Sequence, residues 1–405
     1  MPRLWWGVLA GLVLLLAAAA YVVYALVRSP PGATVVPVSR AAAFAGPRSP
    51  LAWPNQGEAA LAVRGVGFIG SHGPGQPTPI ASIAKVMTAY VVLHDHPLHV
   101  GAAGPQITVT PADAAVFDAD RGTGQSVVPV QPGERLTERQ ALEGMLLPSG
   151  NNIAAMLARW DAGSEGAFVA RMNATAGAMG LAHTHYSDAS GVAASTVSTA
   201  GDQVHLGMRA MAVPVFAQIV GMAQTNLPVA GRQYNKNALL GRNGIVGIKT
   251  GTTSEAGGCF LFAAEDRLAG RTVTIVGAVL HQLASGAQPS IIAAAFAAST
   301  ALLDSARRVV VKRRVLRRGT TLAWIKAPWA DRVPLQAAAS AALVGWPGLR
   351  THTTIVERTV ISGSVITGQE VGSAVIAAGT QHDTVRLVAA RDLPSPSLLW
   401  RLTHP

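Results

Sequence analysis

The chain lacks several features by which common protein classes are recognised. Cys259 is the only cysteine among 405 residues, so the fold cannot depend on an intrachain disulfide. This cysteine could be a modifiable thiol, but a small buried residue on a strand is the more frequent use. Charged residues make up only 13% of the chain, and it contains neither a phosphate-binding loop nor a Gly-x-Ser-x-Gly sequence. These absences argue against phosphate-loop proteins and nucleophile-elbow hydrolases.

Lysine is scarce, because arginine supplies most of the positive charge. The lysines are Lys85, Lys236, Lys249, Lys312 and Lys326. Such an imbalance usually reflects genome composition. However, arginine stays protonated in proteins, whereas the pKa of a lysine falls readily on burial, so a general base requires lysine. We expect a base role for Lys85 and solvated surface positions for Lys236, Lys312 and Lys326.

The positive charge is concentrated in one stretch. The net charge is +11, and the cluster comprises Arg307, Arg308, Lys312, Arg313, Arg314, Arg317 and Arg318. A cluster like this can contact nucleic acid, anionic lipid or anionic wall polymer. The solvated face of a strand is the more frequent explanation, so we expect no nucleic-acid partner.

An uninterrupted apolar run extends from Trp5 to Val27. As a helix it would be about 35 Å long, enough to cross a bilayer with some tilt. Trp5 and Trp6 at one end, and Tyr21 and Tyr24 near the other, suit the two membrane interfaces. A cleaved signal peptide is the alternative, but the run is long for one and no small-x-small site directly follows it. We therefore favour a retained anchor over residues 1–28.

The remaining chain falls into three parts. Residues 29–50 are rich in proline and predict a semi-extended linker. Residues 51–305 place a helical middle between strand patterns, which predicts an α+β domain with a sheet backed by helices and a helical lobe. Residues 306–405 show short alternating strands separated by Gly, Pro and Asp, which predicts a small all-β domain.

Local patterns predict particular elements. We expect a strand at 59–69, a helix from Ile80 to about Leu93, and an alanine-rich helix at 289–305. Thr137 and Gln140 are spaced as a capping box at the start of a helix. Asp113, Asp118 and Asp120 are expected in a polar loop, and His94, His96 and His99 in a solvated one, so no metal is expected.

Three short motifs occur in order: Ser82-Ile83-Ala84-Lys85, Ser149-Gly150-Asn151 and Lys249-Thr250-Gly251. A serine hydroxyl is a weak nucleophile that needs an adjacent base, and Lys85 lies about one helical turn after Ser82. Lys85 can act only when neutral. Burial and a second cation, Lys249, would both lower its pKa.

The other two motifs supply the remaining parts of an acyl-transfer site. Ser149 can pass a proton to a leaving amine, and Asn151 can offer its amide to a substrate, although either could simply cap a helix. Lys249 with the hydroxyls of Thr250 and Thr252 can hold a carboxylate, and Gly251 permits close approach, although a strand-end turn is the plainer explanation. The backbone N–H groups of Ser82 and Thr252 are candidate oxyanion donors. Each motif is a weak signal, but their conjunction indicates acyl transfer through a serine ester.

With these motifs the sequence resembles the D-alanyl-D-alanine carboxypeptidases, which are low-molecular-mass penicillin-binding proteins. The similarity covers roughly residues 51–305. Its most similar segments are Pro79 to Ala89, Leu146 to Asn152, Asn235 to Gly241 and Gly247 to Thr253. The resemblance implies a penicillin-binding/β-lactamase-like catalytic domain. It also implies that Ser82 forms the acyl ester, Lys85 accepts its proton, Ser149 and Asn151 complete the relay, and Lys249 binds substrate.

The implied reaction removes the terminal D-alanine of a peptidoglycan stem peptide, with β-lactams as inhibitors and no cofactor. One departure concerns the arginine that many members carry after the strand following the third motif: here the sequence is Val-Leu-His-Gln-Leu over residues 279–283. The family's C-terminal anchor helix is not evident after Leu399, so the N-terminal run would replace it. We therefore expect a membrane-tethered enzyme acting outside the cytoplasm.

Two alternatives remain open. A class A β-lactamase shares the motifs but needs a glutamate-held water, and none of Asp161, Glu165, Asp188 and Asp202 lies in the required Glu-x-x-Leu-Asn setting. A non-catalytic wall-binding module is the second alternative, against which the intact motifs argue.

Overall fold

The computed structural model describes residues 2–38, 42–44, 46, 50–268, 270–357 and 361–404. The chain divides into two compact units, the first formed by Met1–Pro47 with Lys312–Pro405 and the second by Arg48–Val311. The four-part division that we expect from the sequence stays a prediction.

The second unit contains a five-stranded antiparallel sheet with the strand order β11-β12-β13-β3-β4. Its strands are β3 (Glu58–Val63), β4 (Gly67–His72), β11 (Ile245–Thr253), β12 (Gly257–Leu268) and β13 (Arg271–Gln282). The single strand expected at 59–69 is wrong, because the chain turns at 64–66 and forms the β3–β4 hairpin. Gly65 provides the positive φ, 75°, that this turn needs.

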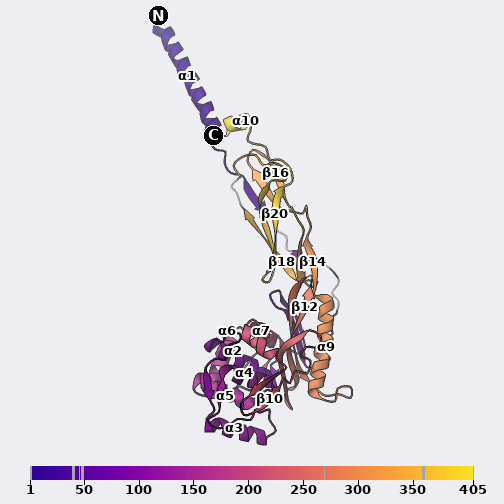
Figure 1. Cartoon of the computed structure of the whole chain (residues 1–405). Coiled ribbons are helices and arrows are strands. Elements are labelled where there is room, and N and C mark those ends of the chain that lie inside the picture. The colour runs from indigo at the N-terminus through magenta and orange to yellow at the C-terminus, as the bar shows by residue number, and fades with distance from the viewer. Residues whose placement is uncertain are drawn as a thin grey trace. The chain divides into compact units, whose positions relative to one another are not determined.

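Helices cover both faces of this sheet. Successive strand residues point to opposite faces, so the neighbours Phe260 and Leu261 on β12 show which helix lies where. Phe260 stacks edge-on against Phe296 of α9 (Ile291–Val309), with ring centroids 5.1 Å apart. On the opposite face lies α7 (Ala200–Ala210), where a Cβ added at Gly207 would stand 3.1 Å from Leu261. Figure 1 shows α9 running beside the sheet.

The helical lobe follows β4 in the sequence and ends before β11. Its helices are η1 (Ala81–Ala84, a 3₁₀ helix), α2 (Lys85–Asp95), α3 (Pro111–Gly122), α4 (Glu138–Leu146), α5 (Asn151–Ala162), α6 (Glu165–Ala178) and α8 (Pro214–Val220). Short strand pairs join them: β5 (Thr78–Pro79) with β8 (Val197–Ser198), β6 (Gln106–Thr108) with β7 (Arg135–Thr137), and β9 (Gln224–Leu227) with β10 (Gly231–Tyr234).

Capping patterns explain two helix starts. The expected capping box is confirmed, because the Thr137 side chain accepts from Gln140 N while Gln140 reaches back to Thr137 N. A second box joins Thr110 and Asp113 at the start of α3. The acidic residues expected in a loop therefore lie on a helix, and Asp113 serves to cap it.

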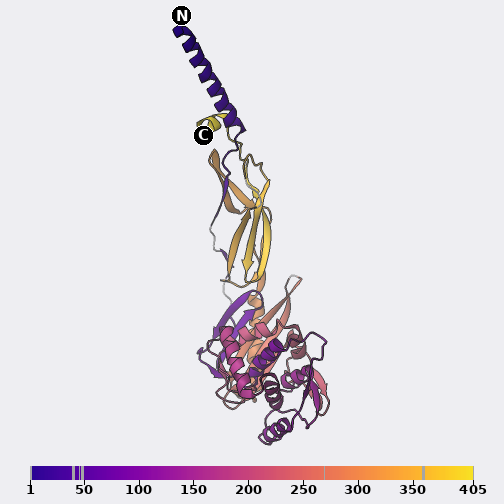
Figure 2. The ribbon, with the colours of Figure 1, turned by 90° about the vertical axis from the view of Figure 1, so that its left-hand side faces the viewer.

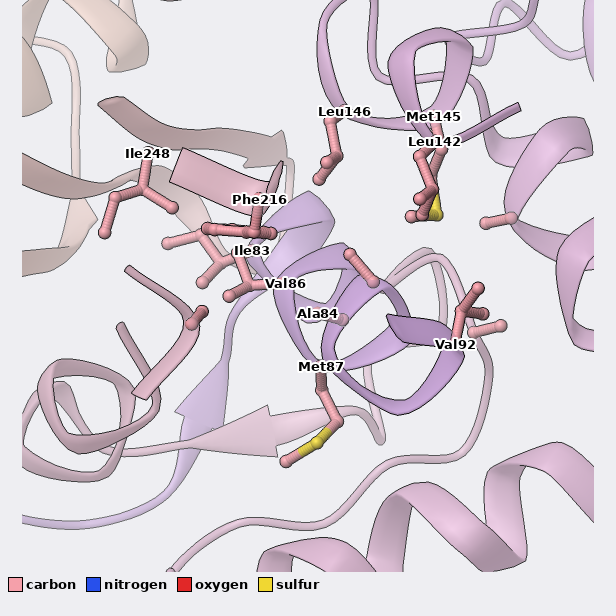
Figure 3. Close-up of a cluster of buried hydrophobic side chains, with 14 of the residues drawn as sticks. Ile83, Ala84, Val86, Met87, Val92, Leu142, Met145, Leu146, Phe216 and Ile248 are labelled. Carbon is pink, nitrogen blue, oxygen red and sulfur yellow. The ribbon is translucent and has the colours of Figure 1, made fainter. Parts of the chain in front are cut away.

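The apolar core of the second unit surrounds η1 and α2. Figure 3 shows Ile83 and Val86 near Phe216 and Ile248, with residues of α4 beyond them. Burying each such side chain contributes about 1.5–3 kcal/mol. The first turn of α2, which carries Lys85, is therefore held in the core, and its residues from Lys85 to Thr88 are all buried.

The first unit is built on a seven-stranded sheet with the order β1-β15-β16-β20-β19-β18-β2, plus the pair β14–β17 (Figure 2). Its strands are β1 (Thr34–Pro37), β2 (Ala42–Ala43), β14 (Val311–Leu316), β15 (Thr321–Ala327), β16 (Ala330–Ala337), β17 (Ala341–Gly345), β18 (Arg350–Glu357), β19 (Glu370–Ala378) and β20 (Gln381–Ala389). The expected all-β character of this region is confirmed.

The sequence prediction for residues 29–50 differs from the structure. β1 pairs with β15 and β2 with β18, so parts of the expected linker are edge strands of this sheet. Edge pairing satisfies the backbone N–H and C=O groups that an extended segment would otherwise leave to water. Residues 39–41, 45 and 47–49 of the expected linker lie outside the described residues.

The apolar run forms helix α1 (Pro2–Val27), and Trp5–Val27, with mean hydropathy 2.4, is long and apolar enough to cross a membrane. A short helix, α10 (Leu398–Thr403), also forms near the end of the chain. Tyr21 Oη donates to Leu402 O over 2.7 Å, and Arg401 donates to Leu26 O over 3.0 Å. The last residues thus contact the end of α1 instead of forming a long helix of their own.

Candidate active site

Ser82 and Lys85 are brought together by a 3₁₀ turn. Ser82 lies in η1 and Lys85 is the first residue of α2, so the α-helix expected from Ile80 begins later than predicted. Residues i and i+3 eclipse one another along a 3₁₀ helix. The Nζ of Lys85 accordingly lies 2.9 Å from the Oγ of Ser82.

The hydrogen bonds of Lys85 are compatible with a neutral amine that faces the serine. Besides Ser82, its Nζ contacts Asn151 Oδ1 at 2.6 Å and the backbone oxygen of Ser190 at 2.7 Å. Both of these oxygens can only accept. A neutral amine has two N–H donors for them, which leaves its lone pair for the proton of Ser82. An ammonium would instead donate to all three oxygens.

Burial is the main cause of the low basicity of Lys85. Its side chain is completely buried, and burial lowers its pKa from the ordinary 10.5 to about 7. The carboxylate of Asp188 acts in the opposite direction, and the charge of Lys236 adds to the lowering. Lys236 is the cation that lowers the pKa of Lys85, whereas Lys249, the cation that we expected in this role, is itself affected by the charge of Lys85.

The carbonyl of Ser190 belongs to a loop that the sequence analysis did not connect with the site. Asp188 organises this loop: its carboxylate accepts from Ser190 Oγ at 2.7 Å, Val192 N at 2.8 Å and Thr196 Oγ1 at 2.5 Å. Gly191, at φ +81°, lets the loop approach η1, because an added Cβ would stand 1.9 Å from Ala81 O.

The second motif lies between α4 and α5. Asn151 uses Oδ1 to accept from Lys85 and Nδ2 to donate to Gln125 Oε1 at 2.8 Å, so one N–H remains for a ligand. Gly150 is the N-cap of α5 and no side chain caps it, so neither Ser149 nor Asn151 serves as a helix cap. Ser149 has φ +70°, a costly conformation for a residue with a Cβ.

The third motif lies inside β11 and not at the strand end that we expected. Lys249 is 2% exposed and donates to Thr250 O at 3.1 Å. Burial, reinforced by the charges of Lys85 and Lys236, lowers the pKa of Lys249 well below its ordinary value. A Cβ at Gly251 would lie 3.0 Å from Ser82 N, so the glycine allows β11 to pass directly beside the nucleophile.

The three motifs border one cavity of about 240 Å³. It is lined by Ser82, Ser126, Ser149, Lys236, Thr250, Gly251, Thr252 and Ile292. Lys85, Asn151 and Lys249 are buried and are not among its lining residues. Sequence reasoning missed Ser126, Gln125 and the carbonyl of Ser190. It also placed Lys236 among solvated lysines: that side chain is exposed, but it borders the cavity.

Other residues singled out from the sequence lie elsewhere. Asp161, Glu165, Asp188 and Asp202 are not among the residues that line this cavity. Cys259 is confirmed as a buried residue of β12, and burial raises the pKa of its thiol to about 12. Within the described part of the chain, His, Cys, Asp and Glu side chains form no group of three or more that could hold a metal.

Comparison with known proteins shows the family of the chain. The model of the D-alanyl-D-alanine carboxypeptidase family, Peptidase_S11, matches residues 68–279. The chain belongs to this family. It is 38% identical over 193 residues to a D-alanyl-D-alanine carboxypeptidase of Mycobacterium tuberculosis, covering 46% of this chain and 62% of that protein. It is 33% identical over 198 residues to a D-alanyl-D-alanine endopeptidase of Pseudomonas aeruginosa, covering 47% and 61%.

Solved structures of other proteins share the fold of this chain. A DD-transpeptidase from Streptomyces superposes with a TM-score of 0.55 at 25% identity, covering 65% of this chain and 100% of that one. Penicillin binding protein 5 from Haemophilus influenzae gives a TM-score of 0.59 at 19% identity, covering 87% and 100%. The expected penicillin-binding fold is thus confirmed. The matched region spans only 62% and 61% of the two curated relatives above.

Proposed function

We propose that this protein is a serine-type D-Ala-D-Ala carboxypeptidase that removes the terminal D-alanine of peptidoglycan stem peptides. The observation that carries the proposal is the 2.9 Å contact between Lys85 Nζ and Ser82 Oγ, made by a buried amine whose two other partners are acceptors only. Membership of the family supports the same chemistry.

In the proposed reaction, the lone pair of Lys85 takes the Ser82 proton as Oγ attacks the carbonyl carbon of the scissile bond. The backbone N–H groups of Ser82 and Thr252 are our candidates to stabilise the oxyanion. The amine of the departing D-alanine takes up a proton through Ser149, and the C–N bond breaks. Water then attacks the ester, with Lys85 again accepting a proton, and releases the shortened peptide.

Substrate binding is assigned to β11. Thr250, Gly251 and Thr252 line the cavity, so the two hydroxyls can hold a substrate carboxylate and the glycine can admit the substrate backbone, while Lys249 lies buried in the same strand. For location, we propose that α1 tethers the enzyme to the cell membrane and that the catalytic unit acts on its outer side. The length and apolar character of Trp5–Val27 support this tether.

Labelling with a fluorescent penicillin tests the nucleophile. We expect a covalent label on the native protein, none on Ser82→Ala, and full labelling of Ser71→Ala, an exposed serine on β4. Labelling that survives Ser82→Ala would reject the assignment. D-alanine release from a peptide ending in D-Ala-D-Ala tests the activity itself, and rapid steady hydrolysis of penicillin would instead indicate a β-lactamase.

A further inference from the structure

We propose that Lys236 is a substrate-binding residue that takes the terminal carboxylate of the peptide in the active-site cavity. This inference rests on the proposed function, because it assumes that the ligand is a peptide ending in a free carboxylate. From the sequence we expected Lys249 and the hydroxyls of Thr250 and Thr252 to hold that carboxylate, and Lys236 to be a solvated surface charge.

The lining of the cavity is the first argument. Of the residues that line it, Lys236 alone has a charged side chain, and the others are serine, threonine, glycine and isoleucine. Lys249 is 2% exposed and directs its amine to Thr250 O, so a ligand in the cavity does not reach it directly. A carboxylate placed near the hydroxyls of Thr250 and Thr252 would meet one cationic side chain at the surface.

Lys236 is also presented on a rigid segment. Its backbone N–H donates to Leu147 O at 3.0 Å, next to the second motif. The preceding side chain, Asn235, donates to Val220 O and Met222 O and accepts from Asn237 N. The Nζ of Lys236 donates to Ser126 Oγ at 2.5 Å, a partner that also lines the cavity. This neutral partner leaves two N–H donors for an anion.

The charges around the site point the same way. Lys85 and Lys249 are fully buried, and burial lowers the pKa of each strongly. Lys236 is exposed, and although partial burial of its amine lowers its pKa, water can still solvate its charge. Among the described residues, no carboxylate lies within ion-pair distance of Lys236. Its charge is therefore available to an anion from outside the chain.

The residues at the end of β13 are not among those that line the cavity. His281 and Gln282 lie at this end, and Gln282 Nε2 donates to Gln56 O at 2.8 Å and to Leu280 O at 3.0 Å. Lys236 lines the cavity from the segment that precedes β11 in the sequence. A cation at this position can hold the terminal carboxylate of a peptide that lies along β11.

A binding experiment without turnover tests the inference. In a Ser82→Ala background, calorimetry compares an N-acetylated peptide ending in D-Ala-D-Ala with the same peptide ending in a carboxamide. We expect the free acid to bind roughly 10- to 100-fold more tightly, the range of a charge-assisted hydrogen bond. Adding Lys236→Met should remove this preference, whereas Lys236→Arg should keep it. Lys326→Met, an exposed lysine of the first unit, is the matched control and should leave it unchanged.

The results separate the possible failures. An acid that binds no better than its amide, or a preference that survives Lys236→Met, would overturn the assignment and return the carboxylate to Lys249 or the threonines. Equal losses for both peptides in Lys236→Met would show a structural role only. Failure of the proposed function would give a different result. The native enzyme would release no D-alanine, although the protein would still bind the free-acid peptide more tightly than the amide.

Discussion

The acylation of Ser82 should depend on pH through Lys85. A general base works only when it is unprotonated, and burial lowers the pKa of Lys85 to about 7. The rate of acylation should therefore be constant above about pH 8 and fall towards tenfold per pH unit below about pH 6, with a midpoint near 7. Acid removes activity because it protonates the base.

The size of the effect follows from the pKa shift. At pH 7 an ordinary lysine with a pKa of 10.5 is neutral in only about one molecule in three thousand, whereas Lys85 is neutral in about half of the molecules. Burial thus raises the reactive fraction roughly a thousandfold, which corresponds to about 5 kcal/mol against the ammonium form. The charges of Asp188 and Asp120 raise the pKa of Lys85, and the charge of Lys236 lowers it.

The assay is the second-order rate of penicillin acylation under stopped flow from pH 5 to 10. A second buried group titrates in the same range, because burial raises the pKa of Glu138 at the start of α4 to about 7. Glu138→Gln removes that titration, so the profile of this variant should keep its midpoint near 7. A midpoint near 10, or one that disappears in Glu138→Gln, would refute the role given to Lys85.

Three other changes test the surroundings of the site. Asp188→Asn removes a negative charge that raises the pKa of Lys85, so the acid limb of the acylation profile should move to lower pH. The substitution also loosens the Ser190 loop, which should slow acylation about tenfold. An unchanged midpoint of the profile would contradict the effect assigned to Asp188. Gly191→Ala places a Cβ 1.9 Å from Ala81 O at a positive φ, and it should lower the free energy of unfolding by more than about 3 kcal/mol in a denaturant titration. The matched Gly177→Ala in α6 meets nothing within 4 Å and should raise it by about 0.5–1 kcal/mol; equal effects would count against the close approach. Deleting residues 2–27 should move the protein from the membrane fraction to the soluble one and leave penicillin labelling intact, and an unchanged membrane fraction would argue against α1 as the tether.

The residues whose side chains do the chemistry were largely visible in the sequence, because their spacing is local. Ser82 and Lys85 are three residues apart, and a 3₁₀ turn brings i and i+3 together as an α-helical turn does. The predicted contact therefore survives although the type of helix was wrong. The capping box at Thr137 is local in the same sense, and it is confirmed.

Features that depend on distant parts of the chain were not predictable. The carbonyl of Ser190 accepts from an amine 105 residues away, and a backbone oxygen leaves no signature in the residue type. β1 pairs with β15, almost 290 residues further on, and an extended proline-containing segment gives no sign of its partner strand. Gln125, which fixes the amide of Asn151, likewise lies 26 residues away on a loop without periodicity.

The scarcity of lysine becomes more informative once the structure is known. Around one cavity, the charge of Lys236 acts on Lys85, and the charges of both act on Lys249, while Lys312 and Lys326 are exposed in the first unit. The two deepest amines lie where a permanent charge would lack solvation, so only a residue that can lose its proton is tolerated there. Lys236 is solvated and has no such requirement, which is why arginine should replace it in the binding experiment but could not replace Lys85. The same residue type thus serves two chemically distinct purposes, and burial decides which one each lysine serves.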